Sequence, residues 1–171
     1  MTLNQTIKKL KDIICNHAQI NSYYFGDIAT WSEFTGIVYR SVVLTLTGAS
    51  YSTPQITLDF TLWISDRLND DNGNQTEALN DTLLILLDFI SQINSPKIDW
   101  QPQTDGKNIS FFDDEAGNDN VDKVAGVKFD FSISIPAPKD RCQVPLSIRT
   151  GIMDEQGLFI LTESGQNITE Q

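Results

Sequence analysis

The sequence predicts an α+β fold in which two helices lie on one face of a mostly antiparallel sheet. Residues 56–65 and 127–135 alternate apolar and polar side chains, which is the period of strands with one buried face. Between them, leucine and isoleucine recur at helical spacing over residues 79–93. Each element is apolar on one side only and therefore needs a partner layer, so we expect the helices to cover the sheet.

The N-terminal third predicts a helix, a loop and a hairpin. A helix is expected over residues 3–19, where one apolar stripe contains Leu3, Ile7, Leu10, Ile14 and Ala18. Residues 21–31 have the character of a loop with a turn at Gly26-Asp27. A strand over residues 37–47 then returns, through the breaker run GASYSTP, to the strand at 56–65.

The second helix is expected to begin near Asn74, which offers an N-cap, and to end before Pro96. Its apolar stripe is expected to contain Leu79, Leu83, Leu86, Leu87, Ile90 and Ile93. Residues 98–123 are polar and predict a long loop with a short strand at 110–112. The strand at 127–135 completes the sheet.

These elements place one domain at residues 1–136, followed by an extension at residues 137–171. Pro136, Pro138 and Pro145 separate that extension from the core. It carries the apolar segment GLFILT, which includes Phe159 and Leu161. Because exposed strand edges attract a partner strand, we expect the extension to be an assembly arm that pairs with a neighbouring chain.

The net charge of −11 is concentrated in two segments. Residues 66–81 carry five acids against one arginine, and residues 99–122 carry seven acids against one lysine. Nucleic-acid binding needs clustered cations that displace phosphate counterions, so this chain is not expected to grip DNA. An acidic surface past which DNA slides is compatible with these charges.

No residue constellation predicts catalysis, a metal site or a cofactor. Lone His17 is expected to interact with the C-terminal dipole of the first helix, and Cys15 and Cys142 are expected to be free thiols. Neither acidic segment matches a calcium-binding EF-hand loop, so both are expected to be solvated. Asp66-Arg67 predicts an ion pair, either within the chain or across an interface. The lysine-interrupted N-terminus predicts neither an export signal nor a membrane span, which favours a cytoplasmic protein.

The order of elements resembles the tail-terminator and neck-ring (head-tail connector) proteins of tailed bacteriophages, as found in crAss-like phages of Bacteroidetes. The resemblance is carried by Phe25-Gly26-Asp27, by the hairpin from Ile37 to Asp66, by Asp66-Arg67 with LNDDNGNQTE, and by the helix ALNDTLLILLDFISQI. It covers about half to two thirds of the chain, and the residues after Pro136 lengthen the chain beyond the simplest tail terminators.

The resemblance implies a non-enzymatic virion protein that forms a homo-oligomeric ring around the DNA channel, in the neck or at the tail end. It would be assembled in the host bacterial cytoplasm and would contact neighbouring neck, portal or tail ring proteins, without a membrane or specific DNA binding. Candidate inter-subunit or lumen contacts are Asp66, Arg67, Asp70, Asp71, Asp113, Asp114, Glu115, Phe159 and Leu161. The alternatives are a monomeric acidic phage accessory or binding module, and an enzyme.

Overall fold

Six strands form one mixed, mostly antiparallel sheet in the computed structural model, which describes residues 1–113 and 122–137. The strands are β1 (Ser22–Phe25), β2 (Ser41–Ser52), β3 (Gln55–Arg67), β4 (Gln101–Gln103), β5 (Ile109–Asp113) and β6 (Val124–Pro136). Their order is β1-β2-β3-β6-β4, and β5 also pairs with β6. Only the pairing of β1 with β2 is parallel.

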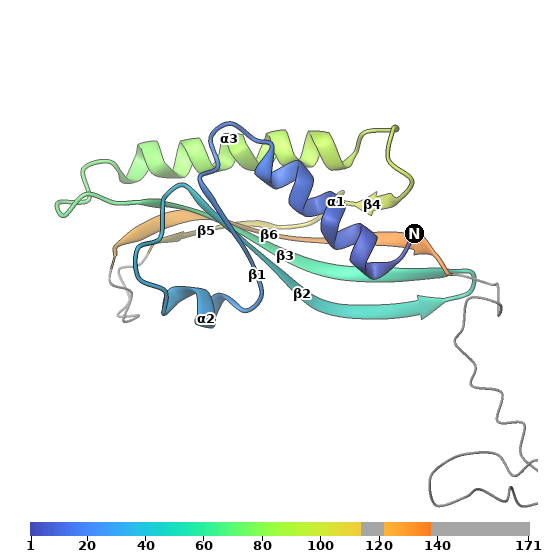
Figure 1. Cartoon of the computed structure of the whole chain (residues 1–171). Coiled ribbons are helices and arrows are strands. Elements are labelled where there is room, and N and C mark those ends of the chain that lie inside the picture. Colours follow the sequence, from blue (N-terminus) through green and yellow to red (C-terminus); the bar gives the residue numbers. More distant parts are fainter. Residues whose placement is uncertain (114–121, 138–171) are drawn as a thin grey trace, which may run out of the picture. The chain divides into compact units, whose positions relative to one another are not determined.

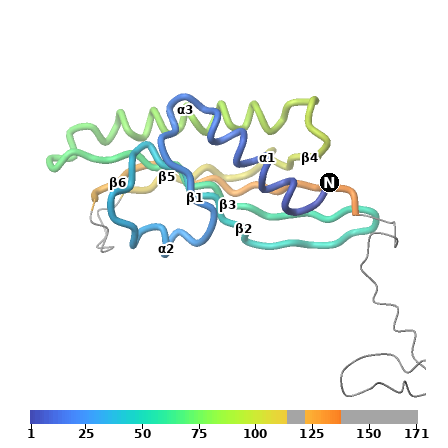
Figure 2. The backbone as a smooth tube through the Cα atoms, viewed as in Figure 1, coloured from blue at the N-terminus to red at the C-terminus, as the bar shows by residue number. Residues whose placement is uncertain are grey.

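Helices α1 (Leu3–Cys15) and α3 (Gln75–Ile93) lie on one side of the sheet, and the short helix α2 (Ile28–Ser32) lies on the other (Figures 1 and 2). The predicted α+β class with two helices on one face is therefore confirmed. Met1–Ala137 forms one compact unit. The predicted assembly arm at residues 137–171, with Phe159 and Leu161, lies outside the described residues apart from Ala137.

The core fills the space between α1, α3 and one face of the sheet. Phe131 lies at its centre, with ring centroids 5.5 Å from Phe60, 5.5 Å from Phe89 and 5.7 Å from Phe129. The alternation predicted for β3 and β6 is confirmed, since the fully buried side chains include Phe60, Leu62, Ile64, Phe129, Phe131 and Ile133. Aromatic rings in this arrangement combine a large buried area with favourable edge and offset-stacked contacts.

The opposite faces of β3 and β6 join through polar side chains that stand directly across from one another. Thr61 Oγ1 donates to Asp130 Oδ1 at 2.6 Å, and Ser132 Oγ donates to Asp59 Oδ1 at 2.7 Å. These pairs match the backbone register, in which Thr61 faces Asp130 and Asp59 faces Ser132. The two central strands are thus fixed on both faces.

Helix α1 is shorter than predicted. It ends at Cys15 with Asn16 as C-cap, whereas the sequence predicts continuation to residue 19. Asn16 and His17 have weak helix propensity. The last turn therefore closes through hydrogen bonds between residues three apart, such as the bond from His17 N to Ile14 O at 3.2 Å. Ala18 therefore lies outside the helix. At the other end, Thr2 and Gln5 form a reciprocal capping box.

The prediction of a loop at residues 21–31 is wrong. This segment contains β1, which pairs in parallel with β2, and the helix α2. Four residues are too few to show the alternation of a strand in the sequence. The segment that follows α1 becomes β1 because its backbone pairs with the free edge of β2. The buried Trp31 anchors α2.

The first hairpin is longer than predicted and shifted along the chain. Strand β2 begins at Ser41 rather than residue 37 and continues through most of GASYSTP to Ser52. The register shifts between Leu46 and Gly48, so a bulge absorbs the glycine without ending the strand. The turn is confined to Thr53-Pro54.

Helix α3 occupies the predicted segment, and its predicted stripe is confirmed in part. Leu86 and Ile93 are buried, and the half-buried Leu79, Leu83 and Ile90 pack against the core. Its buried residues are Ala78, Thr82, Ile85, Leu86, Phe89 and Ile93, whereas Leu87 is 48% exposed. Thr82 tolerates burial because its hydroxyl donates to Ala78 O at 2.8 Å. Asn74 occupies the N-cap position, but its side chain makes no capping bond and instead accepts from Asn69 N at 2.8 Å. The end of α3 is closed by Trp100, whose Nε1 donates to Ile93 O at 2.9 Å.

The polar segment 98–123 is more structured than the predicted long loop. It contains β4 and β5, which pair with different parts of β6. The strand expected at 110–112 is confirmed and extends over Ile109–Asp113. Both strands are short because they add to an edge that β6 already provides.

We predict that Gly126→Ala destabilises the sheet. A Cβ at this position would lie 1.9 Å from the carbonyl oxygen of Ile64 on β3, so the two central strands would have to separate. Overpacking of this kind typically reduces the free energy of unfolding by about 1–3 kcal/mol or more. Urea unfolding measures the loss. Gly73→Ala is the control, because its nearest neighbour is the movable carboxylate of Asp71 at 3.2 Å, and equal losses in both variants would contradict the prediction.

We predict that Tyr23→Phe stabilises the fold. The Tyr23 hydroxyl is buried without a hydrogen-bond partner among the described residues, and burial, with a smaller contribution from Cys15, raises its pKa from 10.0 to about 12. The substitution should increase the free energy of unfolding at pH 7 by about 1 kcal/mol, because no polar group is then left unpaired.

The same substitution should change the alkaline stability profile. The unfolded chain releases the Tyr23 proton near pH 10 and the folded chain near pH 12, so this group lowers stability as pH rises between those values and has no effect below them. Urea unfolding from pH 7 to 11 should show a steeper alkaline decline in the wild type than in Tyr23→Phe. Tyr51→Phe, at an exposed position, should retain the wild-type slope. Parallel declines in wild type and Tyr23→Phe would refute the assignment.

Candidate functional site: an acidic end of the sheet

Asp66, the next-to-last residue of β3, lies beside Arg40, which no sequence pattern indicates. Its Oδ2 accepts from Arg40 Nε at 2.8 Å, and Arg40 Nη2 also bonds to Asp81 on α3. All three side chains are partly buried, with 21–26% of each exposed. Arg40 thus ties the start of β2 to the end of β3 and to α3. We call Arg40, Asp66 and Asp81 the arginine clamp.

The clamp has the electrostatics of a permanent ion pair. The hydrogen bond that Arg40 donates to Asp66 is the main cause that raises the pKa of Arg40 above its usual range, and the charges of Asp66 and Asp81 contribute. A guanidinium can serve two carboxylates at once because its donors point in fixed, separate directions. No local sequence signal joins the three residues, since they lie on separate elements.

Arg67 turns away from Asp66 and pairs with a residue from the second acidic segment. Its Nη2 lies 3.0 Å from Asp122 Oδ1, with the Arg67 side chain 64% exposed. Lys123 makes a similar connection, donating from Nζ to Asp70 O at 3.1 Å. The two acidic segments, which are far apart in the sequence, therefore meet at the end of β3 and the start of β6.

The other predicted acids lie close to this junction. Asp71 caps its own loop by accepting from Gly73 N at 3.0 Å. Asp113, at the end of β5, accepts from Gln75 Nε2 at 2.6 Å, which places it beside the start of α3. Asp70, Asp71 and Asp113 are all exposed.

We call this surface the acidic end and define it as Asp66, Arg67, Asp70, Asp71, Asp113, Asp122 and Lys123. Five acids face two cations, so the surface is negative even after its ion pairs are counted. The structure thus brings together five of the predicted contact residues: Asp66, Arg67, Asp70, Asp71 and Asp113. The predicted contacts Asp114 and Glu115 lie outside the described residues, as do Phe159 and Leu161. Sequence reasoning missed Arg40, Asp81 and Lys123, which no spacing rule connects to this end.

His17 lies just beyond α1, with Nε2 3.3 Å from Asp88 Oδ2 on α3. The structure therefore gives it a side-chain partner across the two helices in addition to its place near the helix C-terminus. Cys15 is an exposed free thiol, and Cys142 lies outside the described residues.

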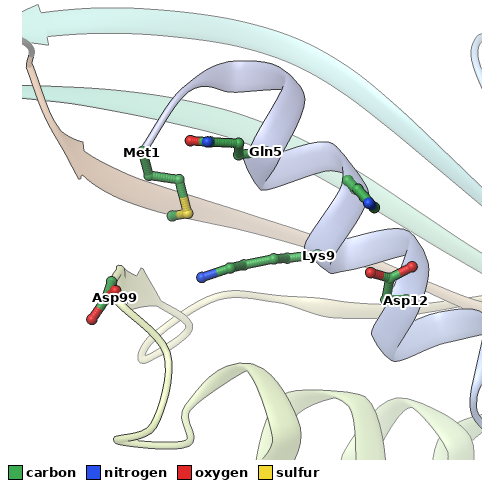
Figure 3. Close-up of a pocket in the computed structure, with 6 residues that line it drawn as sticks. Met1, Gln5, Lys9, Asp12 and Asp99 are labelled. Atoms are coloured by element: carbon green, nitrogen blue, oxygen red, sulfur yellow. The ribbon is translucent and has the colours of Figure 1, made fainter.

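A surface pocket of about 510 Å³ lies beside α1, away from the acidic end. Figure 3 shows Lys9 extending from α1 toward Asp99 across its mouth. The other lining residues are Met1, Gln5, Lys8 and Asp12. Two lysines and two aspartates balance in charge, so the pocket does not select an anion or a cation by its net charge.

Within the described part of the chain, no group of three or more His, Cys, Asp or Glu side chains is arranged to hold a metal ion. None of the helices described is both long and apolar enough to cross a membrane. No protein-family model matches the chain, and no curated protein sequence matches it.

We predict that Arg40→Met destabilises the fold far more than Arg67→Met. The first change leaves the partly buried carboxylates of Asp66 and Asp81 without their cation, and hydrogen bonds to charged groups contribute about 1.5–3 kcal/mol. The second removes only an exposed ion pair, for which we expect less than about 1 kcal/mol. Urea unfolding compares the two losses, and a smaller loss in Arg40→Met would contradict the role of the clamp.

Proposed function

We propose that this protein is a structural subunit of a tailed-phage virion, without catalytic activity, which forms a homo-oligomeric ring in the neck or at the tail end around the DNA channel. The observation that carries the proposal is the convergence of two acidic segments at one end of the sheet, through Arg67 with Asp122 and Lys123 with Asp70. In the ring, the acidic end faces the lumen or an adjacent ring.

The chemistry of that end suits a channel wall better than a binding site for DNA. Its only cations, Arg67 and Lys123, are engaged with Asp122 and with the carbonyl oxygen of Asp70. Few cations remain to displace phosphate counterions, and the excess carboxylates repel the DNA backbone over about one Debye length. Such a surface lets DNA pass without adhering.

The α+β fold also supports the proposal, since it is the fold that the resemblance to tail-terminator and neck-ring proteins implies. The partners would be other copies of the chain and neighbouring neck, portal or tail ring proteins, with assembly in the host bacterial cytoplasm. A monomeric acidic accessory or binding module is the second candidate, favoured by the acidic surface alone. The oligomeric state separates the two.

The direct test is the composition of purified particles. Mass spectrometry of virions from the phage that encodes this chain should detect it in stoichiometric amounts. Native mass spectrometry of the purified full-length protein should show a closed oligomer. A chain absent from virions and monomeric in solution would establish the accessory module instead.

We predict that reversing charge at the acidic end impairs DNA passage rather than assembly. The variant Asp70→Lys, Asp71→Lys, Asp113→Lys should enter particles normally and slow DNA ejection, because phosphate then meets exposed lysines. The matched control, Asp12→Lys, Asp99→Lys, Asp105→Lys, changes the same charge at exposed positions elsewhere and should eject DNA at the wild-type rate. Equal ejection rates for both variants would place the acidic end away from the channel.

A further inference from the structure

The outer edge of β5 has free backbone groups and exposed apolar side chains. Strand β5 pairs only with β6, and no other described residue forms a backbone hydrogen bond with it. Phe111 pairs with the buried Val127, so Phe111 and Ile109, two residues away, lie on the face of the sheet that α3 covers. Both remain in solvent, with Ile109 37% and Phe111 56% exposed.

Helix α3 is apolar over a wider arc than the core uses. Its side toward β2 is marked by Asp81, which bonds to Arg40 just before that strand. Leu83 points nearly the opposite way, because it lies two residues further and each residue turns the helix by about 100°. The sheet order places β6 and the β4/β5 edge on that opposite side. Leu87, one turn beyond Leu83, shares it and is 48% exposed.

The apolar flank of α3 and the apolar side chains of β5 lie at the same level. Gln75 at the start of α3 donates to Asp113 at the end of β5, and α3 runs along the strands (Figure 1). From this contact, α3 rises about 12 Å to Leu83, and β5 extends about 13 Å to Ile109. One apolar strip therefore borders the open edge. We call it the edge strip and define it as Leu83, Leu87, Ile109 and Phe111.

The edge strip has the properties of a binding site for an extended apolar segment. A strand added to β5 would pair with its free N–H and C=O groups. Every second side chain of that strand would lie beneath α3, against Leu83 and Leu87. The segment must therefore be uncharged and must carry large apolar side chains in succession.

Residues 157–162, GLFILT, meet this requirement with four large apolar side chains in a row and no charge. Two other stretches of the chain fit less well. Residues 114–121, which follow β5, carry three acids and one large apolar side chain. Residues 144–148, VPLSI, contain Pro145, which has no N–H to donate to a strand ladder.

We propose that residues 157–162 of one copy pair with β5 of a neighbouring copy and bury its edge strip. The described chain ends beside the β2–β3 turn, where Ala137 N donates to Pro54 O at 2.8 Å. The residues between Ala137 and Gly157 can span about 65 Å when extended. That reach exceeds the length of β6, about 43 Å, so the segment can extend beyond its own subunit.

The contact joins two different surfaces and is therefore head-to-tail. Repeated head-to-tail contacts close into a ring when the rotation between subunits permits. This inference rests on the proposed function, and it assigns a docking site to the predicted assembly arm.

Matched substitutions in the full-length chain test both surfaces. Leu87→Glu should weaken self-association by about tenfold or more, because it buries an unpaired charge. Leu84→Glu is its control, at a position that is 51% exposed on the outer face of α3. In the arm, Ile160→Pro should weaken self-association similarly by removing a backbone donor, whereas Ile148→Pro should not. Circular dichroism verifies folding, and native mass spectrometry measures assembly. Rings of wild-type stability in both Leu87→Glu and Ile160→Pro would overturn the inference.

Cross-linking identifies the partner directly. Unlabelled protein with the photoreactive residue benzoylphenylalanine in place of Phe159 is mixed with isotope-labelled wild type as dilute monomers, and the two are concentrated together. Light should join residue 159 to labelled peptides that contain the edge strip. Cross-links confined to unlabelled chains would overturn the inference, as would the absence of cross-links. So would cross-links to Phe34 or Val38, which line a pocket of about 350 Å³ beside β1 at the opposite edge.

Failure of this inference is distinguishable from failure of the proposed function. If Leu87→Glu and Ile160→Pro still form rings and the chain is found in virions, the protein is a ring subunit that uses other surfaces. If the wild-type chain shows no contact between copies in solution, the docking inference is overturned, and the virion composition alone decides the proposed function.

Discussion

The pairing of β3 with β6 is the interaction on which the rest of the structure depends. The two strands pair from Gln55 with Pro136 to Arg67 with Val124, and they join segments separated by α3 and both acidic loops. One face of the pair supplies the aromatic centre around Phe131, against which α3 packs. The other face is fastened by hydroxyl and carboxylate pairs in the same register. A slip by one residue would exchange these faces and leave the carboxylate of Asp59 or Asp130 in the core.

The acidic end follows from this pairing. Since β3 ends where β6 begins, the loops that leave and enter these strands must lie together, and their charges gather there. Ion pairs such as Arg67 with Asp122 relieve only part of the repulsion. The arginine clamp adjoins this surface and holds Asp66 and Asp81 next to a partly buried cation. Asp66 belongs to both the clamp and the surface, whereas the exposed Asp70, Asp71 and Asp113 carry surface charge without contributing to the core.

The lateral edges have the opposite character. The centre of the sheet is satisfied on both faces, whereas β1 and β5 are short and leave apolar side chains exposed beside them. Edge strands that expose apolar side chains tend to associate with other chains, because both their unpaired backbone groups and their apolar surface can find partners there. Here the pocket beside β1 and the exposed Ile109 and Phe111 of β5 are two such surfaces.

The sequence by itself determined the elements whose pattern repeats over many residues: β3, β6, the position of α3, and hence the fold class. Local periodicity suffices there because each residue reports the same buried face. It did not determine β1, the length of β2, or the whole stripe of α3, which also buries Thr82 and exposes Leu87. Of the candidate site, the sequence identified the acids, but only the tertiary structure decided their partners, joining Asp66 to Arg40 and Arg67 to Asp122. An ion pair between distant segments leaves no periodic trace in the chain, because it depends on the strand register that brings its two ends together.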